Sequence, residues 1–554
     1  MPQENYPTSI NRRYLLAGLA AVTGSVSFSR YLTDAFAAET ASDKEVGTPF
    51  SRATLDRVAR SLAKEQFEDR QLELEGEWSD LSYDEYRDIR FRADNAIWKN
   101  SGTPYQMHLF APGGIFNRPV DIHVVENGRA HRLTFSREMF SFGEVVTRSR
   151  PGFRIQEHAV QLMAREEEAH PRKRASSRSV DEKLTYSGFR IHGFLNTRKY
   201  RDEFLVFQGA SYFRATGKGQ NYGLSARGLA INTGRSSGEE FPYFRAFWIE
   251  RPTRKSRDIV IHALLDSMSL TGAYTFRVRP GKDTVMDVEA TLYPRAEAKH
   301  IGLAPLTSMF LFRQSDRRNF DDFRPAVHDS NGLAMLNGNG EWLWRPLANP
   351  RQLQISSFMD TNPKGFGLIQ RNRDFKDYED LEARYEKRPS LWIEPRGDWG
   401  KGEIELIEIP TDSEINDNIV AFWKPRMELN AGQQFSFAYR MYWGWGERGK
   451  RPPARVVQTM IGKPLSSGKE TDNQRRFVID FEGKNLAGKD LPKAQISLSR
   501  GHISHLDVRE NPVTRGIRAS FILDAEQEQA IDLRMNLASN DKPVSEVWMY
   551  RWTR

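Results

Sequence analysis

The sequence predicts an all-β protein in which a large β-sandwich is followed by a small immunoglobulin-like β-sandwich. Between 286 and 292, apolar and polar residues alternate, as they do in a strand with one buried and one solvated face. Similar short runs occur at 259–265, 404–409 and 435–442. With 554 residues, the chain is too long for one ordinary hydrophobic core, so two or more domains are expected.

A short helical region precedes the strands. Apolar residues recur at helical spacing between 55 and 63, and Ser82 and Glu85 have the spacing of a capping box that opens a second helix. Strand patterns dominate after about residue 103. The charged, apolar-poor segment 165–183 interrupts them and is predicted to be a surface loop.

The clearest domain boundary is the segment 444–453, which is rich in Gly, Pro and charged residues. Beyond it, strand patterns return at regular intervals, for example at 477–481, 517–523 and 531–537, which is typical of an immunoglobulin-like sandwich. The predicted organisation is a signal peptide at 1–37, a binding and catalytic β-sandwich domain at 38–443, a linker at 444–456 and an immunoglobulin-like domain at 457–554.

The N-terminal segment has the features of an export signal. Arg12 and Arg13 are followed by a weakly apolar run at 15–28 and by small residues at 35–37 that suit a signal peptidase. The paired arginines favour the twin-arginine route, which exports folded proteins. The apolar run is shorter than the roughly 20 residues that span a bilayer, and no later segment reaches that length. We therefore expect a periplasmic protein that does not span the membrane.

Composition excludes several classes of function. The net charge is +8, from 81 basic and 73 acidic residues, and no basic block dominates, so nucleic acid is not an expected partner. The absence of cysteine removes disulfides and thiolate chemistry. The histidines lack the spacing of a metal site, and the segment 483–489 begins like a phosphate-binding loop but is not followed by Ser or Thr. We expect no metal and no cofactor.

Two turn-like segments carry carboxylates that could catalyse cleavage of a glycosidic bond. That reaction needs a carboxylic acid to protonate the departing oxygen and a carboxylate to act as base or nucleophile. Asp329 follows a histidine in 327–332, and Asp417 lies just before an apolar run at 419–423, which could partly desolvate its carboxyl group. An Asp at a turn more often bonds to its own backbone, so a structural role stays open for both.

The segment 358–425 is dense in aromatic, acidic, Gly and Pro residues. It is similar to the osmoregulated periplasmic glucan biosynthesis proteins of the G and D types, on motifs at 362–367, 385, 388–390, 392–395, 409–411 and 417–420. The resemblance runs from about residue 45 to 554. It implies a galactose-mutarotase-like sandwich followed by an immunoglobulin-like domain, and the twin-arginine leader favours the D type.

The resemblance also implies roles for four residues. Asp417 occupies the position of the general acid in D-type proteins with glucanase activity, and Asp329 in a His-Asp-Ser motif occupies that of the general base. Glu414 and Tyr385 match residues that line the proton route in the family. Those enzymes invert the anomeric centre of the sugar. The resemblance therefore implies an inverting reaction, and it implies endo-hydrolysis of β-1,2-glucan as the activity.

Sugar rings are bound by the faces of aromatic rings and by polar groups that contact their hydroxyls. Blocks at 209–214 and 222–229 also resemble the family. Aromatic residues in such blocks more often belong to the core, whereas an arginine among small residues is seldom only solvated surface. The predicted substrate contacts are Arg214, Arg227, Tyr212, Tyr222 and Trp392.

Three functions remain open on the sequence. The leading hypothesis is a periplasmic hydrolase that cuts inside β-1,2-glucan chains. The second is a transglycosylase that branches or cyclises the same backbone, because the segment 461–474 is short and polar where active relatives carry an aromatic loop that reaches a neighbouring subunit. The third is a non-catalytic glucan-binding scaffold. Because that loop contacts a neighbouring subunit in the relatives, whether this chain forms a homodimer also stays open.

Inverting hydrolysis predicts a wide separation between the two carboxyl groups. Retaining enzymes hold their pair at about 5–5.5 Å, and direct inverting enzymes need roughly 6.5–9.5 Å to admit a water molecule. A relay through a sugar hydroxyl would lengthen the gap further. We therefore expect Asp329 and Asp417 to lie beyond the retaining range.

Overall fold

The computed structural model describes residues 47–72, 74–153, 184–317, 320–450, 454–464, 473–483, 486 and 490–554. The predicted signal peptide 1–37, the predicted loop 165–183 and most of the segment 461–474 lie outside these ranges. Strands make up 49% of the structure and helices 9%, which confirms the all-β prediction. Among the described residues, no helix combines the length and apolar character that crossing a bilayer requires.

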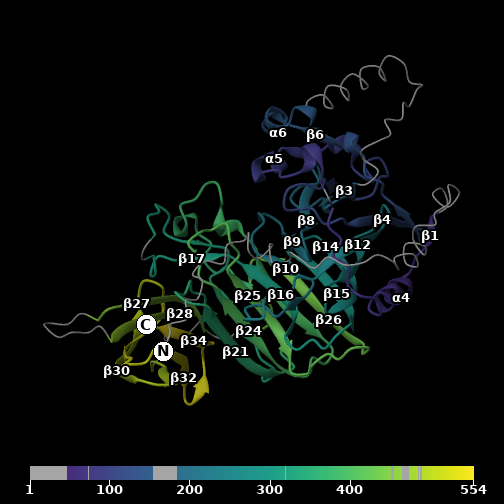
Figure 1. The fold of residues 1–554 in the computed structure, drawn as a ribbon. Coiled ribbons are helices and arrows are strands. Elements are labelled where there is room, and N and C mark those ends of the chain that lie inside the picture. The colour runs from purple at the N-terminus through teal and green to yellow at the C-terminus, as the bar shows by residue number, and fades with distance from the viewer. Residues whose placement is uncertain are drawn as a thin grey trace, which may run out of the picture.

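The first large sheet runs through the whole molecule (Figure 1). Its strands, in spatial order, are β1 (Thr48–Pro49), β5 (Arg129–Arg132), β4 (Asp121–Glu126), β12 (Tyr243–Glu250), β13 (Ile259–Asp266), β14 (Leu270–Arg279), β15 (Thr284–Pro294), β26 (Phe435–Gly444), β23 (Ser390–Arg396), β22 (Gly365–Ile369), β19 (Gly332–Leu336), β20 (Trp342–Pro346), β34 (Val547–Thr553), β32 (Ala530–Ser539) and β29 (Lys493–Leu498), with β33 (Lys542–Pro543) beside β32. The alternation at 286–292 lies in β15, where the apolar side chains are buried as predicted.

The second large sheet packs against the first. Its strands, in spatial order, are β21 (Gln354–Thr361), β24 (Lys401–Glu408), β25 (Ile419–Pro425), β16 (Ile301–Ser308), β10 (Ser225–Arg227), β9 (Tyr212–Ala215), β8 (Asp202–Gln208), β7 (Gly188–Gly193) and β3 (Tyr105–Phe110), with β11 (Ala230–Ile231) beside β16. Phe207 and Phe213 of this sheet meet Phe276 of β14 edge to face, with ring centroids 5.2 and 5.3 Å apart. One aromatic-rich core therefore lies between the two sheets.

The helical region forms where the sequence predicts it. Helix α4 (Arg52–Leu62) begins after Ser51, whose hydroxyl accepts a hydrogen bond from the backbone of Thr54. Its apolar face packs on Trp248 and neighbouring residues of the first sheet, at the right of Figure 1. Helix α5 (Tyr83–Arg87) carries the predicted capping box between Ser82 and Glu85. Other short elements of the N-terminal part are α6 (Glu144–Ser149), β2 (Ile89–Phe91), β6 (Phe140–Phe142) and the 3₁₀ turns η1 (Gly76–Trp78), η2 (Ala93–Asn95) and η3 (Arg137–Met139), and the 3₁₀ turns η5 (Phe375–Asp377) and η6 (Tyr385–Lys387) lie further along the chain.

The C-terminal strands form a second layered unit at one end of the molecule (Figure 1, yellow). A four-stranded sheet consists of β27 (Ala454–Gly462), β28 (Gln474–Gly483), β31 (Gly516–Asp524) and β30 (His502–Asn511). It packs on β32 and β34, which extend the first sheet because β34 pairs in parallel with β20. Strand β27 begins inside the predicted linker 444–456. The predicted domain boundary stays a prediction.

A buried arginine links the two parts of the chain. The side chain of Arg371 is 4% exposed and donates to Glu546 at 2.6 and 3.0 Å and to the carbonyl of Val456 at 2.6 Å. Its guanidinium lies over the ring of Trp344, 3.5 Å from the centroid, and 3.5 Å from the carboxylate of Glu447. Because these charges are withdrawn from water, each depends on the others for its hydrogen bonds.

Replacing Glu546 with Ala should destabilise the protein by about 3–5 kcal/mol, because it leaves a buried guanidinium without its main partner. Thermal unfolding followed by circular dichroism measures the effect. Arg534→Ala is the matched control: it removes an ion pair to Glu341 across the same junction, but both side chains are well exposed, so about 0–1 kcal/mol is expected. Equal losses in the two variants would contradict the role assigned to Arg371.

Candidate active site

The segments that carry the two predicted catalytic carboxylates meet at one strand. Asp417 lies in the loop between β24 and β25, and Asp329 follows β18 (Val327–His328), which pairs with β17 (Phe310–Phe312). Asn418 donates to the carbonyl of Phe310 at 3.0 Å and accepts from its N–H at 2.8 Å. The N–H of Asp329 donates to the carbonyl of Met309 at 2.8 Å. Two consecutive residues therefore anchor both loops.

Asp329 is a buried carboxyl group, 3% exposed. Burial and, to a lesser degree, the negative charge of Asp417 raise its pKa, while the positive charges of Arg388 and Arg214 oppose that shift. The guanidinium of Arg388 donates to its Oδ1. The neighbouring His328 is stacked on Phe310, and burial lowers its pKa to about 3, so it is neutral and contributes no charge to Asp329.

Asp417 is nearer the surface, with its side chain 16% exposed. Its Oδ2 lies 3.9 Å from Nη2 of Arg214 and has no hydrogen-bond partner in the described part of the chain. Arg214 is held in place by a 2.6 Å hydrogen bond from its Nε to the hydroxyl of Ser225 on β10. One oxygen of Asp417 therefore faces the fixed guanidinium of Arg214 and accepts no hydrogen bond in the described part of the chain.

Tyr385 connects the remaining predicted residues to this pair. Its hydroxyl donates to Oε2 of Glu414 at 2.7 Å, and its ring lies under Arg388, 4.1 Å from guanidinium carbon to centroid. Burial, with the charges of Asp329 and Glu414, raises the pKa of Tyr385, so its hydroxyl keeps the proton it donates. The contacts thus run without a break from Glu414 through Tyr385 and Arg388 to Asp329.

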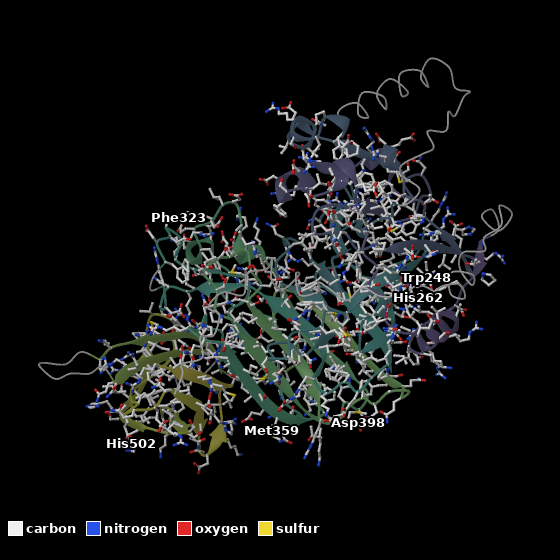
Figure 2. All side chains as sticks on the ribbon, viewed as in Figure 1. Trp248, His262, Phe323, Met359, Asp398 and His502 are labelled. Carbon is white, nitrogen blue, oxygen red and sulfur yellow. The ribbon has the colours of Figure 1, made fainter. Side chains whose placement is uncertain are left out.

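A second arginine fixes Glu414. Nη1 of Arg324 donates to it at 2.8 Å, and the same guanidinium binds Asp322 at 2.7 Å and Asp380 at 2.9 Å. Asp380 also caps the turn before Tyr385 by accepting from two backbone N–H groups. The adjacent Phe323 projects into solvent from the same loop, above β17 (Figure 2).

The predicted substrate-binding residues differ in exposure: some are partly accessible, some are buried beside the site, and one lies in the core. Arg227 is buried, donates to Glu239 at 2.6 Å and lies over the ring of Tyr212, 5.4 Å from its centroid. Burial alone would lower the pKa of Arg227, but Tyr212, Glu239 and Asp417 together raise it, which places this cation in the same electrostatic environment as the site. Arg227 therefore supports Tyr212, whereas Arg214 and Tyr212 remain partly accessible.

Tyr222 belongs to the loop 216–223, which packs beside Arg388. Its hydroxyl is buried without a hydrogen-bond partner among the described residues, and burial, followed by the nearby charge of Glu203, raises its pKa. Trp392 lies apart from all of these residues. It is 1% exposed on β23, and its ring stacks on Trp342 with centroids 5.3 Å apart. A sugar ring cannot reach Trp392 in this structure, so its place is in the core rather than in substrate contact.

Sequence reasoning missed three residues of the site. Arg388 and Asn418 lie within recognised motifs, but their bonding partners come from segments far away in the sequence. Arg324 lies outside those motifs and could have been found only as the one basic residue between Asp322 and the His-Asp-Ser motif. In the described ranges, no three His, Asp or Glu side chains gather in a way that could hold a metal ion.

Comparison with known proteins decides the family. The sequence model of the family described as "Periplasmic glucan biosynthesis protein, MdoG" matches residues 50–552. The chain belongs to this family. Proteins named glucans biosynthesis protein G are similar over most of their length: those of Shewanella baltica (strain OS195) and Vibrio cholerae serotype O1 (strain ATCC 39315) are each 47% identical over 507 and 504 residues, which are 91% of this chain and 87% of the relative. The protein of Shewanella frigidimarina is 48% identical over 504 residues, 91% of this chain and 85% of the relative.

These relatives correct the expected D type. Members of the periplasmic glucan biosynthesis family that match this chain at 47–48% identity are named for the G type. The D-type prediction rested on Arg12 and Arg13, which precede the matched residues 50–552. An export leader is removed from the mature protein and makes no contact in its fold, so it carries no information about the type of the mature domain.

The raised pKa of Asp329 predicts the sign of a pH effect on stability. Between the unfolded value of about 3.9 and its higher folded value, the folded state binds more protons at this group than the unfolded state. The free energy of unfolding of the wild type, relative to that of Asp329→Asn, should therefore fall as pH rises through this window and then level off. Urea unfolding of both proteins across the pH range measures the difference. A difference that grows with pH would contradict the burial of an ionisable group.

Proposed function

We propose that this chain shapes the backbone of periplasmic glucans by inverting endo-hydrolysis of β-1,2-glucan, with Asp417 as general acid and Asp329 as general base. The observation that supports this assignment is the common anchoring of both loops on Met309 and Phe310, which brings two carboxyl groups into electrostatic contact. Membership of the periplasmic glucan biosynthesis family supports glucan as the substrate class.

The proposed chemistry divides between a partly exposed carboxyl group, Asp417, and a buried one, Asp329. Asp417, whose side chain is 16% exposed, would protonate the glycosidic oxygen, and Arg214, 3.9 Å from its buried Oδ2, would stabilise the carboxylate that remains. Asp329 would accept the proton of the attacking water, because burial makes its carboxylate a stronger base. Glu414 and Tyr385 would order the route between solvent and Asp329. The separation of the two carboxyls beyond the retaining range stays part of this proposal.

The ion pair between Asp329 and Arg388 favours a second candidate function. A carboxylate held by a guanidinium is less free to accept a proton, and the same pair would rigidify a surface that only binds glucan. A non-catalytic glucan-binding scaffold is therefore the alternative. The transglycosylase hypothesis rests on the segment 461–474, most of which lies outside the described residues, and the homodimer rests on the same segment.

Asp417→Asn should lower the rate at which purified protein shortens linear β-1,2-glucan by about 10²–10⁴-fold, because the amide cannot donate the acid's proton. Product chain lengths are measured by mass spectrometry. Asp412→Asn is the matched control, since Asp412 is exposed in the same loop, and it should leave the rate unchanged.

Three outcomes decide between the candidates. Unchanged chain length with the wild-type protein at high loading would refute hydrolysis. Cyclic or rearranged products without new reducing ends would favour transfer over hydrolysis. Full restoration of glucan production in cells by Asp417→Asn would favour the scaffold, because the variant keeps the shape of the site and loses only the acid.

The proposal also includes export to the periplasm by the twin-arginine route, directed by Arg12 and Arg13. Replacing Arg12 and Arg13 together by Lys should leave the precursor in the cytoplasm, since the transport machinery reads the arginine pair. Cell fractionation and immunoblotting measure the distribution. Arg30→Lys, which lies after the apolar run, serves as the control and should be exported normally. Normal export of the double variant would overturn the route.

A further inference from the structure

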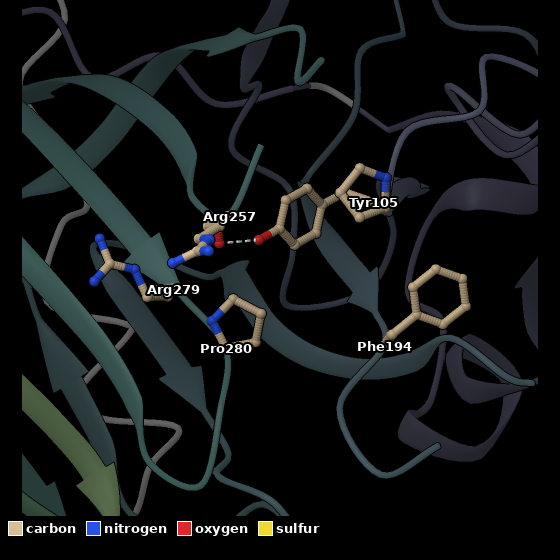
Figure 3. Close-up of a pocket in the computed structure, with 6 residues that line it drawn as sticks. Tyr105, Phe194, Arg257, Arg279 and Pro280 are labelled. Carbon is tan, nitrogen blue, oxygen red and sulfur yellow. Dashed lines mark hydrogen bonds between the residues drawn. The ribbon is translucent and has the colours of Figure 1, made fainter. Parts of the chain in front are cut away.

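A hollow lies at the edge of the second sheet, beside β3, and none of the predicted site residues lines it (Figure 3). Its volume is about 260 Å³. Proline and aromatic side chains form its walls, and two arginines stand at its side: Pro104, Tyr105, Phe194, Arg257, Arg279 and Pro280. The hydroxyl of Tyr105 donates to the backbone carbonyl of Arg257, which holds the arginine-bearing loop in place.

Two loops rich in basic residues border this hollow. The loop 194–201 is tied down by Arg201, which donates to the carbonyl of Thr103 at 3.0 Å and lies 4.5 Å from the ring centroid of Phe194. The loop 254–258 approaches the same strand end, where the side chain of Arg254 packs over Gly102. We call the two loops together the basic rim.

The rim carries several cations that form no salt bridge among the described residues. Arg198, Lys199, Arg254, Lys255 and Arg257 are all exposed, and none forms an ion pair with a carboxylate in the described part of the chain. The acids close to them are engaged elsewhere. Asp258 accepts two hydrogen bonds from Arg279, at 2.6 and 3.0 Å, and Asp202 accepts from the backbone and side chain of Asn196.

Exposed aromatic rings accompany these cations. Phe194 is 41% exposed and Tyr200 is 64% exposed, at opposite ends of the loop 194–201. Basic side chains beside aromatic rings on a protruding loop are the combination that binds the interface of an anionic bilayer, because cations meet lipid phosphates while the rings enter the headgroup region.

We propose that the basic rim docks this protein on an anionic membrane surface, with Arg257 binding a lipid phosphate at the mouth of the hollow. Charge complementarity supports this partner, and the exposed rings of Phe194 and Tyr200 beside the cations suit the headgroup region of a bilayer. The family's periplasmic description is compatible with such a surface. The inference does not depend on the glycosidic chemistry.

The rim also contacts the loop that borders the candidate active site. The side-chain oxygen of Asn196 accepts a 2.8 Å hydrogen bond from the N–H of Gly219, in the loop 216–223. In the same loop, the N–H of Asn221 donates at 3.1 Å to the carbonyl of Lys387, next to Arg388. Docking through the rim would therefore hold the site at a fixed height above the membrane.

Co-sedimentation with lipid vesicles tests the proposal on the full mature chain. Binding to vesicles of phosphatidylcholine with 30% phosphatidylglycerol is expected, with little binding to pure phosphatidylcholine and loss of binding as salt rises. The combined variant Arg198→Gln, Lys199→Gln and Arg257→Gln should bind about 100-fold more weakly, since each cation near the surface contributes about fivefold. Tyr200→Ser should weaken the binding that survives at high salt.

The matched control removes the same charge from the opposite end of the molecule. Lys493→Gln, Arg515→Gln and Lys542→Gln replace exposed residues of the C-terminal unit and should bind like the wild type. Equal weakening of both triple variants would overturn the proposal, as would equal binding to neutral vesicles. Stabilisation by millimolar inorganic phosphate without vesicle binding would indicate a small-anion site instead. Retention on polyglutamate without vesicle binding would indicate an acidic protein partner, and either result would overturn membrane docking.

Discussion

The side chain of Asn418 determines how the candidate site is assembled. By bonding both backbone groups of Phe310, it fixes the loop of Asp417 beside Met309, whose carbonyl anchors Asp329. An amide is suited to this task because it offers a donor and an acceptor in one plane. The bond lies directly beside Asp417, so it is the nearest of the contacts that fix this loop and set the position of the carboxyl relative to Arg214.

Arginine shapes the electrostatics of the site. Arg214, Arg324 and Arg388 each face a different carboxylate, and each is fixed by a further hydrogen bond or by an aromatic ring. A planar guanidinium can serve two partners at once, which lysine cannot do with comparable geometry. The arrangement keeps several carboxyl groups close together in a partly buried region without leaving their charges uncompensated.

Local patterns made much of the fold predictable. Alternation at 286–292 identified a strand because its period is set by the backbone, and the spacing of Ser82 and Glu85 identified a cap because both bonds are local. Family motifs singled out Asp329 and Asp417, whose loops bond to the neighbouring residues Met309 and Phe310, and their catalytic roles stay predictions. The pairing of β20 with β34 and the partners of Arg388 could not be predicted, because they join segments without any local signal. Trp392 was misread because an aromatic residue in a motif looks the same whether it packs inward or outward.

The pairing of β20 with β34 has a consequence for how this protein can be divided. Separable modules meet through side chains, so that cutting the chain between them leaves two intact surfaces. Here the backbone hydrogen bonds of the first sheet continue from β20 into the C-terminal strands. A fragment that ends before β27 would expose the edge of β20, which carries Trp342 and Trp344. An exposed strand edge of this kind can pair with strands of other chains. The C-terminal strands thus protect the edge of β20 from pairing with other chains, and this protection is part of the same chain.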